Sequence, residues 1–157
     1  MKKIALFVDI QNIYYTCRDT YGRQFNYRKL WEKITADGDI VIANAYAIER
    51  DDTKQYKFQS ALKHLGFNIK LKPYIQRSDG SAKGDWDVGI TIDILETAND
   101  IDTVILLSGD GDFDRLLDKL TQKYKVKTEV YGVQKLTANS LIKACDIFHP
   151  IGEELLL

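Results

Sequence analysis

The chain has 157 residues, of which 45% are hydrophobic, and its formal net charge at pH 7 is −1. This length and apolar content suit one domain with its own core, and the near-neutral charge argues against a polycation that binds nucleic acid over its whole surface. We therefore expect a single domain over residues 1–150, followed by a short tail over residues 151–157 that is disordered or lies against a neighbouring molecule.

The two cysteines and the N-terminal segment indicate the cellular compartment of the protein. Cys17 and Cys145 lie far apart and lack the spacing of metal ligands, which is typical of structural thiols in a reducing compartment. The apolar run after the N-terminal lysines stops at Asp9, too early for a signal peptide or a membrane span. We expect a cytoplasmic protein with no membrane partner.

Strand and helix patterns alternate along the chain. Strands are expected over residues 3–9, 40–48, 67–74, 104–107 and 126–131. A short helix is expected after the first strand, and further helices over residues 27–36, 51 or 52 to 66, 85–98, 113–124 and 138–144. This order predicts a three-layer α/β/α fold with a mostly parallel, Rossmann-like sheet between the helices.

Acidic residues stand at the ends of these elements. Asp9 ends the first strand, and the helix over residues 85–98 brings Asp85, Asp87 and Asp93. Asp85 and Asp87 would lie about 200° apart on a helix, so they cannot both face one site, and we expect one of them to cap the helix. Asp93 is expected on a solvated helix face.

The segment after the fourth strand is the most informative of the chain. Ser108, Gly109 and Gly111 break the apolar pattern, so Asp110 and Asp112 lie in a strand-to-helix turn. At the carboxyl edge of a parallel sheet such a turn is where ligands bind, and two carboxylates there indicate a divalent cation. If the first and fourth strands are neighbours, Asp9 and Asp110 lie side by side.

An EF-hand is excluded for this turn. The sixth position of such a loop would be Arg115 rather than Gly, and the twelfth would be Thr121 rather than Glu. Asp and Gly are also ordinary turn residues, so the turn taken alone fits a structural role and a functional one about equally.

Three motifs together carry a family resemblance. They are Asp9-Ile10-Gln11-Asn12, Lys83-Gly84-Asp85-Trp86-Asp87 and Ser108-Gly109-Asp110-Gly111-Asp112-Phe113. With the segments Ser140-Leu141 and Ala144-Cys145-Asp146-Ile147-Phe148, they resemble the NYN domains of the LabA-like group, within the PIN-like nuclease superfamily. The resemblance covers nearly the whole chain and implies a PIN-like fold and a metal-dependent ribonuclease.

The residues that this resemblance carries over form an acidic set with one polar companion. They are Asp9, Asp87, Asp110, Asp112 and Asn12. Hydrolysis of a phosphodiester requires charge neutralisation and an activated water, which carboxylate-held Mg²⁺ or Mn²⁺ can supply. We expect Asp9 and Asp110 as primary ligands, Asp87 and Asp112 to complete the site, and Ser108 and Asn12 to hold waters or the phosphate.

The charge distribution favours RNA as the partner. Residues 50–83 hold eight Lys or Arg against three acids, and residues 84–118 hold ten acids against one Arg. Candidate phosphate contacts are Lys54, Lys57, Lys70, Lys72, Arg77 and Lys83. Tyr14, Tyr15, Tyr74 and Trp86 are candidates for stacking unpaired bases, which favours single-stranded or loop RNA, whereas Trp31 and Phe58 are expected in the core.

Other enzyme classes fit less well. A phosphatase of the haloacid dehalogenase type would have a second Asp where this chain has Gln11, and no Gly-x-Gly-x-x-Gly turn for a dinucleotide is present. A Toprim-like metal domain would begin with a Glu in place of Asp9. With only His64 and His149, neither near the turn, a metal-free acid–base mechanism is hard to build.

A catalytically quiet RNA-binding or regulatory adaptor of the same fold is the main alternative, because fold alone does not establish activity. The complete acidic set argues against it. A homodimer is compatible with the sequence, and the three leucines that end the chain are one candidate contact.

Overall fold

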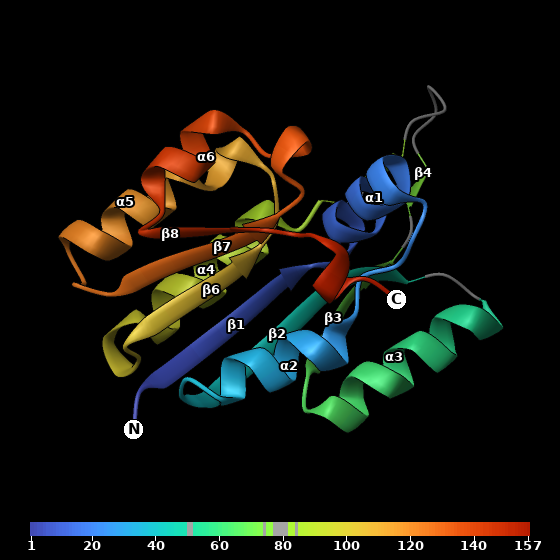
Figure 1. Cartoon of the computed structure of the whole chain (residues 1–157), viewed down its shortest axis with the longest axis horizontal. Helices are drawn as coiled ribbons and strands as arrows, with labels where there is room; N and C mark the ends of the chain where they lie inside the picture. Colours follow the sequence, from blue (N-terminus) through green and yellow to red (C-terminus); the bar gives the residue numbers. More distant parts are fainter. Residues whose placement is uncertain (50–51, 74, 77–81, 84) are drawn as a thin grey trace.

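The computed structural model describes residues 1–49, 52–73, 75–76, 82–83 and 85–157. Its centre is a six-stranded sheet in which every neighbouring pair is parallel (Figure 1). The strand order is β3-β2-β1-β6-β7-β8. The strands are β1 (Lys3–Asp9), β2 (Asp39–Glu49), β3 (Asn68–Pro73), β6 (Thr103–Leu107), β7 (Lys127–Gly132) and β8 (Ile147–Pro150). The predicted α/β fold with a mostly parallel sheet is confirmed.

Helices cover both faces of this sheet. They are α1 (Ile10–Tyr21), α2 (Tyr27–Thr35), α3 (Thr53–Leu65), α4 (Asp87–Thr97), α5 (Asp114–Gln122) and α6 (Asn139–Ala144). The first three pack on one face in a core that includes Ile13, Leu30 and Leu62, and the last three pack on the other (Figure 1). Short 3₁₀ turns complete the chain at Ala98–Asp100, Gly111–Phe113, Gln134–Leu136 and Glu153–Leu155.

Strand β1 is central because its side chains serve both cores. Leu6 and Val8 point into the core under α1, α2 and α3, while Ala5 and Phe7 point into the opposite one. This alternation explains the near-continuous apolar run in the sequence, since a strand covered on both faces needs apolar residues at every position.

The strand order reverses between β1 and β6. From β1 the chain builds outward to β2 and β3, and it then returns to add β6, β7 and β8 on the other side. The two strands are in register, with Val8 opposite Leu107, so the residues that follow each strand meet at one edge of the sheet. Such a reversal is the usual place for a ligand site in open α/β folds.

A second, two-stranded sheet is separate from the first. In it β4 (Ile75–Gln76) pairs antiparallel with β5 (Ala82–Lys83). Both strands lie between the expected strand over residues 67–74 and the expected helix over residues 85–98, where no strand was predicted.

The C-terminal segment departs from the prediction. Leu155 and Leu156 are buried in the core of α1, α2 and α3, Leu156 forms a β-bridge with Phe25, and Asn26 N donates to Leu155 O at 2.7 Å. The expectation of a disordered tail was wrong, and of the three leucines proposed to contact a neighbour two are buried within their own chain and Leu157 is exposed. The two buried leucines supply apolar surface that this core buries.

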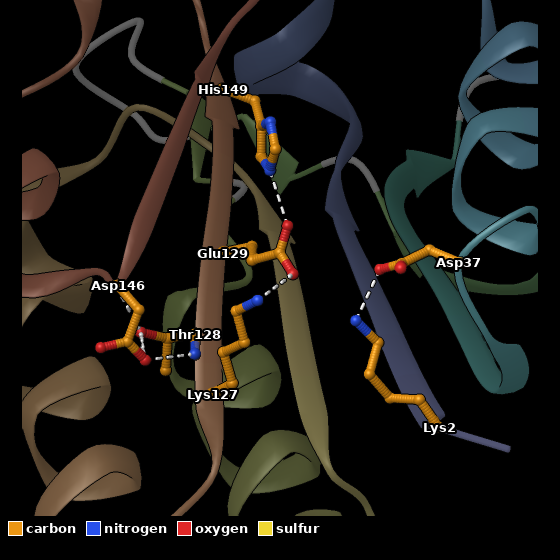
Figure 2. Close-up of polar contacts among 7 residues, drawn as sticks. All are labelled: Lys2, Asp37, Lys127, Thr128, Glu129, Asp146 and His149. Atoms are coloured by element: carbon orange, nitrogen blue, oxygen red, sulfur yellow. Dashed lines mark hydrogen bonds and ion pairs between the residues drawn. The ribbon is translucent and has the colours of Figure 1, made fainter.

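Hydrogen bonds and ion pairs of polar residues connect β7 and β8 at the edge of the sheet (Figure 2). His149 Nε2 lies 2.6 Å from Glu129 Oε1, which links the last two strands. Asp146 Oδ2 accepts the backbone N–H of Thr128 at 2.9 Å. These contacts hold β8 on the sheet although its strand is short.

None of the helices in the described part of the chain combines the length and the apolar character that a membrane crossing requires.

Candidate metal centre

The turn after β6 is held by hydrogen bonds to its own side chains. Asp110 N donates to Ser108 Oγ at 3.1 Å, and Asp112 N donates to Asp110 Oδ1 at 2.9 Å. Asp110 thereby caps the 3₁₀ turn Gly111–Phe113, as short acidic side chains commonly do. The result is a turn in which the carboxyl groups of Asp110 and Asp112 are brought close together.

Gly109 is needed in this turn because there is no room for a side chain. A Cβ atom built on Gly109 would lie 2.7 Å from the backbone oxygen of Leu136, well inside contact distance. Ala138 N also donates to Gly109 O at 3.0 Å. The turn is therefore pressed against the segment that leads into α6.

The end of β1 is bonded directly to this turn. Asp9 caps α1 by accepting Asn12 N at 3.4 Å, and Ser108 Oγ donates to Asp9 Oδ2 at 3.5 Å. The side-chain oxygen of Asn12 accepts Gly109 N at 2.9 Å. The first and third sequence motifs therefore form one hydrogen-bonded unit, and the predicted neighbourhood of Asp9 and Asp110 is what the strand order produces.

The start of α4 brings in the second motif. Asp85 is exposed, and its Oδ1 accepts Asp87 N at 3.2 Å at the beginning of the helix. Asp87 is half-buried, and one of its oxygens comes within 4.8 Å of ligand oxygens of Asp110 and Asp112. The N-cap of α4 is Trp86, which makes no side-chain capping bond, and Asp85 accepts the N–H of the first helical residue from the position before it, while Asp87 joins the cluster.

The cluster concentrates negative charge. Burial raises the pKa of Asp87 to about 7, with further contributions from its hydrogen bond to Asp110 and from the charges of Asp110, Asp85 and Asp9. Burial also raises the pKa of Asp9 to about 6, and the charge of Asp110 adds to this effect. Among the ion pairs between described residues, none neutralises Asp9, Asp87, Asp110 or Asp112.

This donor set fits a hard divalent cation. Asp87, Asp110 and Asp112 supply carboxylate oxygens, which Mg²⁺ and Mn²⁺ prefer, and they have no cationic partner of their own in the described structure. Asp9 lies beside this group of three but is not part of it.

Two lysines that were predicted to contact phosphate, Lys70 and Lys72, instead make contacts within the protein. Lys72 Nζ donates to Asp85 O at 2.9 Å and lies 4.5 Å from the centre of the Trp86 ring. Lys70 Nζ pairs with Asp93 at 2.8 Å. Both lysines thus hold α4 against the edge of the sheet. Arg77 and Tyr74 lie outside the described residues, as does the side chain of Lys83.

The aromatic residues predicted to stack on bases fall into two groups, exposed and packed within the protein. Tyr14 and Tyr15 on α1 are exposed, and the guanidinium of Arg18 lies over both rings. Trp86 instead packs on Tyr46 and donates its indole N–H to Ala47 O at 2.9 Å. The expectation that Trp86 stacks on a base was wrong, because Lys72 and the core occupy its surroundings, whereas Trp31 and Phe58 pack against the core as predicted.

Asp93 also differs from the prediction. It is half-buried rather than solvated, and its Oδ2 accepts both the Tyr46 hydroxyl at 2.7 Å and Lys70 Nζ at 2.8 Å. Asn44 Nδ2 extends this network by donating to the Tyr46 hydroxyl at 3.1 Å. A polar Asn in an otherwise apolar strand was the only local signal of this buried network.

Comparison with known proteins gives one family match and one relative that each cover nearly the whole chain. The family model described as the NYN domain matches residues 3–152. The "Low amplitude and bright protein LabA" of Synechococcus elongatus is 29% identical over 159 residues, which span 96% of this chain and 84% of that protein.

Two solved structures are also similar. The crystal structure of VPA0982 from Vibrio parahaemolyticus, described as a protein of unknown function, is 52% identical, with a TM-score of 0.94 over 99% of this chain and 96% of that one. A ribokinase from Giardia lamblia is 13% identical, with a TM-score of 0.52 over 95% of this chain and 57% of the ribokinase, and shows a likeness of fold alone.

Proposed function

Because the chain belongs to the NYN domain family, we propose that it is a metal-dependent ribonuclease that hydrolyses RNA phosphodiester bonds at the carboxylate cluster. Members of the NYN and PIN-like superfamily are generally nucleases, and they usually use divalent metals. The observation that carries the proposal is the convergence of Asp87, Asp110 and Asp112 at the reversal of strand order.

The acidic residues would together coordinate Mg²⁺ or Mn²⁺. Asp87, Asp110 and Asp112 are close enough to ligate one ion, and Asp9 would complete the site directly or through water. Such an ion supplies charge neutralisation at the phosphate and activation of a water molecule. These residues would hold the ion as carboxylates; near neutral pH the raised pKa of Asp87, about 7, leaves this group partly protonated, so binding of an ion there would favour its ionised form.

The polar residues around the cluster would position it. Ser108 donates to Asp9 and accepts from Asp110 N, so we assign its hydroxyl to orienting these two acids. Asn12 uses its side-chain oxygen on Gly109 N, which leaves its amino group as a donor for a phosphate oxygen. Tyr14, exposed on the same helix, is the candidate for stacking an unpaired base.

The test is cleavage of an end-labelled, mostly unpaired RNA in the presence of Mg²⁺, Mn²⁺ or EDTA. Wild type is compared with Asp110→Asn and with Asp118→Asn, an exposed α5 residue outside the cluster, all purified identically. Cutting that requires metal and is lost only in Asp110→Asn supports the proposal. Equal cutting by all three indicates a contaminant, and no cutting by any of them favours an RNA-binding adaptor.

The cytoplasmic location and the homodimer stay predictions. Both cysteines are free, as expected for a reducing compartment. A dimer would need a surface other than Leu155 and Leu156, which are buried within their own chain.

A further inference from the structure

A cavity of about 500 Å³ is lined by residues of α1 and α3. Figure 1 shows these two helices on the same side of the sheet, and both contribute side chains to the same core. The segment that joins α1 to α2 supplies Gln24 and Phe25 to its wall, and the end of β2 supplies Ala47 and Ile48. Its volume is within the range of ordinary small-molecule sites.

Two polar side chains line the wall of this cavity. Gln59 on α3 and Tyr27 on α2 are each 8% exposed. Neither side chain hydrogen-bonds to another described residue, and neither is among the described side chains with a fully buried, unpaired polar atom, which are Thr20 and Thr103. The Gln59 amide and the Tyr27 hydroxyl therefore open onto the cavity, where a ligand with both donors and acceptors can reach them.

The remaining wall is aromatic, with charges near it. Phe25 and Phe58 pack edge-on against Tyr27, and exposed Tyr14 lies on the α1 side. Lys54 and Lys57 of α3 also line the cavity, are exposed, and form no ion pair with a described residue. Asp52, the acid in this wall, is already used as the α3 cap by accepting Lys54 N at 2.8 Å.

Two residues of the cavity wall directly follow the proposed ligand Asp9 in the chain. Ile10 and Gln11 line it and directly follow Asp9. Burial raises the pKa of Tyr27, and nearby Cys17 and Asp9 raise it further, so the hydroxyl stays protonated and able to donate. A group bound in the cavity therefore contacts the segment that directly follows Asp9.

We propose that this cavity binds one unpaired nucleobase of the RNA, with Gln59 and Tyr27 reading its edge and Lys54 and Lys57 contacting the adjoining phosphates. The inference rests on the proposed function, since it names the part of the substrate held beside the cluster. An amide and a hydroxyl match the edge of a base, flat aromatic walls match its faces, and lysines match its phosphate. A purely apolar ligand would leave Gln59 and Tyr27 unpaired. A paired base would have its edge already occupied.

The experiment measures binding without cleavage. Fluorescein-labelled five-nucleotide RNAs (oligo-A, oligo-U, oligo-C and a version with one abasic ribose in the middle) are titrated with protein in EDTA and followed by fluorescence anisotropy. Wild type is expected to prefer one base and to lose that preference with the abasic RNA. Gln59→Leu is expected to weaken binding of the preferred RNA roughly tenfold.

The controls separate this contact from general loss of structure. Gln122→Leu changes an exposed glutamine of α5 on the opposite face and should bind like wild type. Lys57→Ala should weaken all RNAs alike, whereas Lys63→Ala, an exposed lysine of the same helix, should not. Leucine nearly matches glutamine in size, so the thermal midpoint of Gln59→Leu reports whether the variant is folded.

The outcomes distinguish this inference from the proposed function. Base-dependent binding in EDTA that Gln59→Leu and Lys57→Ala both weaken supports the cavity, even if wild type proves unable to cut RNA. If wild type cuts RNA with metal but these two variants bind and cut as wild type does, the cavity assignment is overturned and the nuclease stands.

Discussion

The side-chain oxygen of Asn12 accepts the backbone N–H of Gly109 at 2.9 Å, and this bond joins the helix after β1 to the turn after β6. Gly109 is buried, so its N–H has no water to replace a lost partner. The same two segments carry Asp9 and Asp110, and the bond therefore sets the spacing of the acids.

Removing this acceptor should cost both stability and activity. Asn12→Leu leaves a buried N–H unpaired, and we expect a loss of about 1–3 kcal/mol in the free energy of unfolding, measured with urea. Asn12→Asp keeps an acceptor oxygen and should retain more of the stability. Asn99→Leu, an exposed position after α4, is the control, and an equal loss there would contradict the role of Asn12.

Divalent cations should stabilise the fold. Only the folded chain assembles the three carboxylates, so at a free concentration of 100 Kd a bound ion adds about 2.7 kcal/mol, or roughly 5–11 °C in Tm. Differential scanning fluorimetry with Mg²⁺ or Mn²⁺ measures the shift. Asp110→Asn should abolish most of it and Asp118→Asn should not. A shift of equal size in both variants would place the ion elsewhere.

The raised pKa of Asp87 predicts how stability depends on pH when EDTA is present. The folded pKa of about 7 exceeds the ordinary value of 3.8, so the folded state binds more protons between these values. Stability contributed by protonated Asp87 is therefore full at low pH and is lost as the pH rises through about 7. Asp87→Asn should flatten this part of the profile and be more stable than wild type at pH 8. An unchanged slope would contradict the assignment.

The lowered pKa of Glu129 predicts the opposite sign at the far edge of the sheet. The hydrogen bond from His149 lowers the pKa of Glu129, so ionised Glu129 stabilises the fold above its ordinary pKa of 4.5. This contribution is lost as the pH falls below that value. Urea unfolding of wild type and Glu129→Gln should show a difference at pH 6 that shrinks toward pH 3. A difference that grows on acidification would rule out this pairing.

Gly109→Ala should distort the metal centre. Its Cβ would meet the Leu136 backbone oxygen at 2.7 Å, and backbone on both sides must shift, at an expected cost of about 1–3 kcal/mol and a loss of cleavage. Gly152→Ala is a matched control, because its Cβ would approach only the end of the Glu154 side chain, at 3.1 Å. Similar stability and activity of the two variants would contradict the close approach.

Sequence patterns predicted the features of the fold and of the site that depend on residues close together in the chain. The buried strands, the different positions of Asp85 and Asp87 at the start of α4, and the acidic turn at Asp110 follow from apolar period, helix geometry and turn residues. The family motifs then linked these segments across the chain. Asp9 was expected beside the turn on the condition that the first and fourth strands are neighbours, and the strand order meets this condition.

What the sequence missed depends on tertiary contacts. Lys70 and Lys72 look like free cations in a basic segment, but Asp93 and the Asp85 carbonyl lie across the sheet edge from them. Trp86 looks exposed beside charged residues, but Ala47 O accepts its N–H. The cavity beside Gln59 could not be predicted because its walls come from three helices, a strand and a connecting segment.

The pairing of β1 with β6 also has a consequence for folding. These neighbours in the sheet are separated by about 100 residues in the chain, as the register of Val8 with Leu107 shows. Contacts this distant in sequence close large loops and form slowly. A partly folded chain therefore lacks an assembled acidic cluster, so under the proposed function a newly made or misfolded molecule would not cut the RNA around it until the centre of the sheet is complete.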